Sequence, residues 1–139
     1  MLRSDHLSFT YHLSVSLPYE RKETNMEEMK KGKIKNIDVS QVLKLEELVN
    51  YQTGQVVSKT LAQNPHVSLT LFSFDRGEEI SSHSSDGDAM VTVLDGVGRF
   101  TVGEETFLLQ KGETLVMPNH VPHAVYGEEQ FKMLLTVVF

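Results

Sequence analysis

The sequence predicts an all-β domain built as a sandwich or a barrel, and three observations support this. Short apolar runs recur from Gly54 onward, and turn residues such as Asn64-Pro65 and Asp86-Gly87 separate them. Several of these runs alternate apolar and polar residues, which is the period of a half-buried strand. Strands at this regular spacing favour a sandwich or a barrel over a fold that alternates strands and helices.

The composition fits one soluble globular domain. The chain has 139 residues, 40% of them hydrophobic and 23% charged, and no window is apolar over the length that crosses a bilayer. The formal charge of -6 argues against nucleic acid as a partner, because phosphate binding needs clustered Lys and Arg. The absence of cysteine excludes disulfides, a thiolate nucleophile and a cysteine-based zinc site. A reducing cytoplasm is the simplest location.

Residues 1–30 are interpreted as an N-terminal extension, and residues 31–139 as the barrel domain. Alternation over Leu7–Leu17 places six apolar residues on one face, as in a strand. A second interpretation is that translation starts at Met26. Residues Arg21–Asn25 can be encoded by a purine-rich run containing AAGGAG, a bacterial ribosome-binding sequence. If the segment is made, we expect an edge strand or a poorly ordered tail.

The elements of the barrel domain follow in order along the chain. A short helix or turn is expected over Ser40–Asn50, with Asp38 or Ser40 as its N-cap. The expected strands are Gln55–Leu61, Val67–Asp75, Ile80–His83, Ala89–Leu94, Arg99–Val102, Thr106–Leu109, Thr114–Met117, His123–Tyr126 and Phe131–Val138.

Alternation within the last strand indicates which side chains enter the core. Lys132 is expected to face water, so the residues on the opposite face point inward. These inward residues are Phe131, Met133, Leu135 and Val137.

Two local patterns suggest a bend and a turn. Alternation breaks at Leu71-Phe72, as in a strand that bends between sheets or lies at a subunit contact. If Phe72 and Phe74 are left outside, they favour a homodimer. The run Gly96–Gly98 lacks the third glycine and the following helix of a nucleotide-binding loop, so it is expected to be a hairpin turn.

Two glycine-led segments contain the candidate functional residues. The first is Gly77-Glu-Glu-Ile-Ser-Ser-His83, running on to Gly96, and the second runs from Gly112 through Pro118 to His123. Over residues 54–139 these segments resemble the two motifs of the cupin superfamily, and in particular small single-domain bacterial cupins. The resemblance implies a jelly-roll β-barrel, commonly dimeric, with any ligand bound inside the barrel mouth.

The resemblance also implies that the usual metal ligands are only half present. The second histidine of the first motif is Ser85 here, and the glutamate position is Ala89. The family's glycine in the second motif is His120. Three imidazoles and a carboxylate suit Fe, Mn, Ni or Zn. Here His83 and His123 remain, with a hydroxyl and a methyl group in place of the other ligands.

Two alternatives describe how these residues could act. His83 and His123 could hold a divalent metal, with His120 as a third ligand or Asp86 or Asp88 as a carboxylate. Two histidines alone rarely hold such an ion. The other alternative is that both rings are polar residues lining the barrel, satisfied by water or by each other.

Three functions are compatible with these alternatives. The first is binding of a small molecule, apolar or acidic, without a firmly held metal. The second is a metal-dependent enzyme such as a dioxygenase, decarboxylase or isomerase, and the third is a structural role of the dimer. Fold alone does not choose among them, and the first is preferred. The predicted ligand-binding residues are His83, Ser85, Ala89, Val91, Met117, His123 and Met133, with Val93 and Leu115 beside them.

Overall fold

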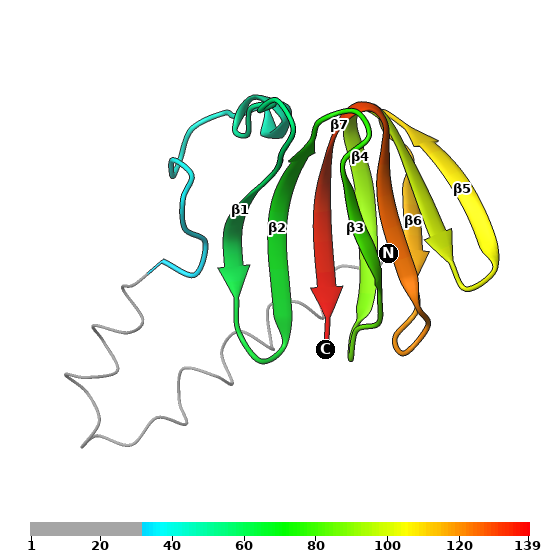
Figure 1. Ribbon diagram of the computed structural model, residues 1–139. Coiled ribbons are helices and arrows are strands. Elements are labelled where there is room, and N and C mark those ends of the chain that lie inside the picture. Colours follow the sequence, from blue (N-terminus) through cyan, green and yellow to red (C-terminus); the bar gives the residue numbers. More distant parts are fainter. Residues whose placement is uncertain (1–31) are drawn as a thin grey trace, which may run out of the picture. The chain divides into compact units, whose positions relative to one another are not determined.

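The structure is a computed structural model that describes residues 32–139. This part of the chain contains seven β-strands (Figure 1). The strands are β1 (Val56–Gln63), β2 (Val67–Phe74), β3 (Glu79–His83), β4 (Asp88–Val102), β5 (Glu105–Gln110), β6 (Thr114–Met117) and β7 (His123–Val138). The all-β prediction is confirmed. The helix expected over Ser40–Asn50 is a single 3-10 turn, η2 (Leu45–Glu47). Within these residues no helix is long and apolar enough to cross a membrane.

The strands form two layers that share β4 and β7. The second half of β7 lies between β2 and the first half of β4. Its first half lies between β3 and the second half of β4. With β1, β5 and β6 added at the edges, the layers run β1-β2-β7-β4-β6 and β3-β7-β4-β5. In Figure 1 the orange and red halves of β7 meet at the top, where the strand bends. This is the jelly-roll arrangement that the sequence predicted.

The prediction of a hairpin turn at Gly96–Gly98 is wrong. Glycines instead allow β4 and β7 to bend. β4 continues through these residues with register shifts, so the two strands expected there are one bent strand. Gly96 has φ +71, and a Cβ on it would lie 1.8 Å from the Gln130 carbonyl oxygen. A Cβ on Gly127 in β7 would lie 2.6 Å from the Asp75 carbonyl oxygen. Only glycine allows backbones to approach this closely.

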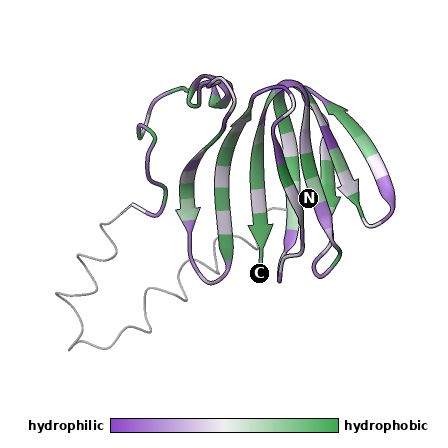
Figure 2. Cartoon of the chain, in the orientation of Figure 1, coloured by the Kyte–Doolittle hydropathy of each residue, from purple (hydrophilic) through white to green (hydrophobic). Residues whose placement is uncertain are grey.

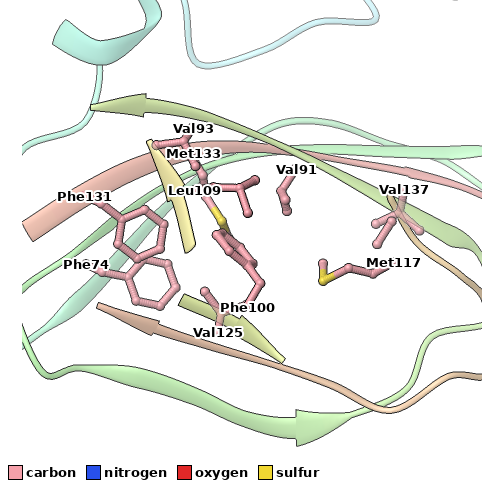
Figure 3. Packing of buried hydrophobic residues seen from close by; sticks show 11 residues of the cluster. Phe74, Val91, Val93, Phe100, Leu109, Met117, Val125, Phe131, Met133 and Val137 are labelled. Carbon is pink, nitrogen blue, oxygen red and sulfur yellow. The ribbon is translucent and has the colours of Figure 1, made fainter. Parts of the chain in front are cut away.

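The interior between the layers is filled by one apolar cluster (Figure 3). Its aromatic centre is Phe131, whose ring stacks on Phe74 at 4.6 Å and meets Phe100 edge-on at 5.9 Å. The inward orientation predicted for the last strand is confirmed for Phe131, Met133 and Val137, and Leu135 is half-buried against the same cluster. Figure 2 shows the underlying pattern, in which bands of higher and lower hydropathy alternate along the strands.

A second apolar cluster lies on the outer face of the β1–β2–β7 layer. Leu71 is fully buried there, against Val49 and Leu61, and the segment before β1 covers it. Phe72 and Phe74 therefore face the interior, so the condition under which they would favour a homodimer is not met. The alternation breaks at Leu71-Phe72 because both faces of β2 are covered, so both accept apolar residues.

Lys132 lies on the outer face of β7, opposite the interior, as predicted, but it is half-buried there because the segment before β1 covers it as well. Its Nζ donates to the Glu46 carbonyl oxygen at 2.5 Å and lies 4.8 Å from the centre of the Tyr51 ring. Tyr51 in turn donates to Asp95 at 2.5 Å, and its burial raises the pKa of the phenol. Lys111 binds the Glu46 carboxylate at 2.9 Å. These contacts attach the covering segment to β4, to β7 and to the turn between β5 and β6.

Two predictions concern the N-terminal extension, residues 1–30. The strand expected at Leu7–Leu17 and the alternative start at Met26 lie outside the described residues, and both stay predictions.

Candidate functional site

His83 and His123 lie side by side although they are far apart in the chain. His83 ends β3, His123 begins β7, and the two residues pair directly across these strands. Their ring centres are 4.5 Å apart and the ring planes are inclined by 64°. We call this end of the barrel, with the loops 84–87 and 118–122, the histidine end. It is opposite the bends of β4 and β7 in Figure 1.

A bulge in β3 places both rings on the interior face. Ile80 and His83 are three positions apart, so a regular strand would turn them to opposite faces. The register shifts between them, because two residues of β3 lie opposite one of β7. Ile80 and His83 therefore share the face of their partners Val125 and His123, which are 3% and 4% exposed. His83 itself is exposed.

Backbone carbonyls fix the tautomer of both rings. Nδ1 of His83 lies 2.9 Å from the Ser81 oxygen, and Nδ1 of His123 lies 3.1 Å from the Val121 oxygen. A carbonyl oxygen only accepts, so each Nδ1 has the hydrogen and each Nε2 of the neutral ring keeps a lone pair. Burial lowers the pKa of His123 and outweighs the bond to the Val121 carbonyl, which raises it, while the proximity of the ionisable His83 lowers it further. The neutral form is thus favoured at His123.

Ser85 is close in sequence to His83 but does not share its strand. β3 ends at His83, so Ser85 lies beyond the strand and not two positions further along the same face. The Ser85 hydroxyl instead closes a local turn, with the nitrogen and the oxygen of Gly87 each 3.1 Å away. The Ser85 carbonyl oxygen accepts from the His120 nitrogen at 2.9 Å and so joins the two loops.

The other candidate metal ligands, His120, Asp86 and Asp88, contact each other or Asn119. Nδ1 of His120 lies 3.9 Å from Asp86, and both side chains are exposed. The Asp88 carboxylate accepts from the Asn119 backbone nitrogen at 2.9 Å and from its amide group at 3.2 Å. The Asp88 bonds join the start of β4 to the loop 118–122 at the histidine end.

The residues present do not fit a metal site of three imidazoles and a carboxylate. In residues 32–139 no group of three or more His, Asp or Glu side chains could hold a metal ion. His83 and His123 contribute two nitrogen donors, and the positions of the other ligands are the turn residue Ser85 and the apolar Ala89. His120 does not complete the set.

The apolar residues predicted to contact a ligand belong to the packed interior. Ala89, Val91, Met117 and Met133 are at most 2% exposed and lie in the interior cluster. They form an apolar lining of the barrel behind the histidine end. Their role as ligand contacts stays a prediction.

Sequence reasoning missed three features of the fold. The bulge at Ser81-Ser82 had one signal, the odd spacing between Ile80 and His83. No signal in the sequence indicated the other two features, which are surface hollows. One, of about 310 Å³, lies between η2 and β4 and is lined by Leu45 and Leu94 among others. The other, of about 610 Å³, is polar and includes Tyr51 and Asp95.

Comparisons with known proteins agree with this architecture. Residues 70–139 match the family described as Cupin domain. A solved protein of unknown function from Streptococcus pyogenes is 45% identical, with a TM-score of 0.76, over 78% of this chain and 95% of that one. A cupin superfamily protein from Desulfitobacterium hafniense is 32% identical, with a TM-score of 0.74, over 78% and 99%. No curated protein matches the sequence at a significant level.

A third solved structure is similar over a shorter stretch. A cupin 2 conserved barrel domain protein from Leptotrichia buccalis is 47% identical, with a TM-score of 0.67, over 68% of this chain and 46% of that one. The fold and its paired imidazoles define a small jelly-roll barrel with a polar end. The chain belongs to the cupin superfamily, among the small bacterial conserved-barrel proteins.

Proposed function

We propose that this chain binds a small molecule at the histidine end of its barrel, with His83 and His123 as polar anchors. The observation that supports this is the direct pairing of the two residues, with ring centres 4.5 Å apart. Each ring uses Nδ1 for a backbone carbonyl and leaves Nε2 without a hydrogen-bond donor among residues 32–139.

Access and burial both support the proposal. His83 is exposed, so a ligand can reach the pair from solvent. His123 is 4% exposed, and hydrogen bonds to such a group are stronger than those to a hydrated one. Ser85 borders the same end through its turn, and the apolar interior behind keeps water out.

A ligand found by screening is expected to raise the Tm of the native protein, and to lose this effect on the Tm when His83 is replaced. At about a hundred times its Kd, a ligand that binds only the native state adds about 2.7 kcal/mol to the free energy of unfolding. For a domain of this size we expect the Tm to rise by more than about 5 °C. The His83→Ala variant should show no such rise in a thermal-shift assay.

The control for this experiment is His66→Ala, because His66 is an exposed histidine in the turn between β1 and β2. Its response should equal that of the native protein. An unchanged response in His83→Ala, with the fold intact by circular dichroism, would contradict the proposal.

The alternative of a metal-dependent enzyme is not favoured, because the donor set is incomplete. Protein purified without chelator or nickel resin is expected to contain less than about a tenth of an equivalent of Fe, Mn, Ni or Zn. Elemental analysis measures this directly. Metal content near one equivalent that falls in His83→Ala would restore the alternative.

We also propose that the protein is a homodimer, through an uncharged patch on the outer face of β4 and β6. Met90 and Val116 pair across these strands and are 41% and 52% exposed. Beside them Thr92 and Thr114 join their hydroxyls at 3.0 Å. A second copy can cover such a patch with its own, because these four side chains have no charge and meet their copies without repulsion.

Replacing Val116 with lysine is expected to convert a dimer into a monomer, because two like charges would then meet at the two-fold axis. Light scattering after size-exclusion chromatography measures the mass. The matched variant is Leu108→Lys, since Leu108 is 59% exposed on β5. A native protein that is already monomeric, or a Val116→Lys dimer, would contradict this use of the patch.

A further inference from the structure

The histidine pair offers two hydrogen-bond acceptors and no donor. Each Nδ1–H is already bound to a carbonyl oxygen of its own strand or loop, that of Ser81 or Val121. The two nitrogens of an imidazole point to opposite sides of the ring, so each Nε2 is directed away from its own backbone. Among residues 32–139 no group donates a hydrogen bond to Nε2 of His83 or His123. Each lone pair is therefore available to a ligand.

The charges at this end of the barrel are negative. Asp86 and Asp88 lie in or beside the loop 84–87, and in the described part of the chain neither forms an ion pair with a lysine or arginine. The lysine and arginine side chains that form ion pairs do so elsewhere, Arg99 with Glu128 and Lys111 with Glu46, whereas the His120 ring lies 3.9 Å from Asp86 at this end. A carboxylate or phosphate would thus meet lone pairs and like charges, at a cost in desolvation that no donor offsets.

We infer that the ligand of the His83–His123 pair is a small cation that has N–H donors, such as an amidinium or ammonium compound, and not an anion. This rests on the proposed function and narrows it. Two N–H groups of a planar amidinium can donate to the two Nε2 atoms, and the carboxylates of the loops favour its charge. The acidic ligand considered from the sequence is disfavoured for the same reasons.

The tautomer of the two rings gives a test that needs no ligand and no substitution. Long-range ¹H–¹⁵N correlation spectra of the ¹⁵N-labelled full chain, recorded at about pH 8, distinguish a protonated ring nitrogen from one with a lone pair. We expect Nδ1–H and a free Nε2 in both His83 and His123. A hydrogen on Nε2 of either ring would overturn the inference and leave the proposed function standing.

The second test compares two probes of the same shape and opposite charge, benzamidine and benzoate. At about pH 8 benzamidine should shift the ring signals of His83 and His123 with a Kd at least about tenfold lower than that of benzoate. His83→Ala should remove the shift, and His66→Ala should keep it. Equal or tighter binding of benzoate would overturn the inference alone. If neither probe moves either ring, the proposed binding site fails together with it.

Discussion

Replacement of Gly96 by alanine is expected to lower the free energy of unfolding by about 4 kcal/mol, a large part of the stability of an ordinary domain. The residue has φ +71, which costs an alanine about 1–2 kcal/mol by itself. The added Cβ would also lie 1.8 Å from the Gln130 carbonyl oxygen. That oxygen belongs to β7, so relief requires β4 and β7 to separate where both strands bend.

The control is Gly112→Ala, which has the same conformational problem without the collision. Gly112 has φ +88, and no heavy atom lies within 4 Å of the position that an added Cβ would take. We expect a loss of about 1 kcal/mol there. Urea unfolding followed by circular dichroism gives both values. Equal losses in the two variants would contradict the close approach of β4 and β7 at Gly96.

Replacement of Phe131 by alanine is expected to lower the free energy of unfolding by about 3–5 kcal/mol. The ring is fully buried and lies between those of Phe74 and Phe100. Its removal leaves a cavity that the surrounding strands can fill only in part, and it ends two aromatic contacts. A Cβ on Gly98 would lie 2.7 Å from this same ring, so the space around it is already closely filled.

Phe139→Ala is the matched control for this substitution, because it removes the same ring from a surface position. Phe139 is 55% exposed and its backbone nitrogen keeps its bond to the His66 oxygen. We expect a change of less than about 1 kcal/mol. The same chemical unfolding experiment measures both variants. A loss at Phe139 as large as that at Phe131 would show that the interior cluster is not the main source of stability.

Much of the strand assignment could be predicted, because a strand between a core and a solvent-facing side has a period of two. Thr114–Met117 was predicted with its observed bounds, and Val67–Asp75 exceeded its observed strand by one residue. The errors fall where a glycine could equally end a strand or bend it. A turn was expected at Gly96, and the expected strands His123–Tyr126 and Phe131–Val138 stopped on either side of Gly127. Only the neighbouring backbone shows that the strands continue through both glycines.

The candidate site was predictable in its residue types but not in its geometry. Two histidines in glycine-led segments pointed to one end of a barrel. Their pairing depends on the register of β3 against β7 and on a bulge that reverses one side-chain direction. The position of Ser85 outside β3 has the same origin, because the end of a strand is set by its pairing partner and not by its own residues.

The sequence by itself determined an all-β class, because hydrophobic period and turn residues are local properties of the chain. The resemblance of its two glycine-led segments to the cupin motifs implied a barrel with an incomplete set of metal ligands. Only the tertiary structure decided that His83 and His123 touch, which nitrogen of each ring stays free, and what covers Leu71 and Lys132. These depend on contacts between segments far apart in sequence, and such contacts follow from strand register and bending in space.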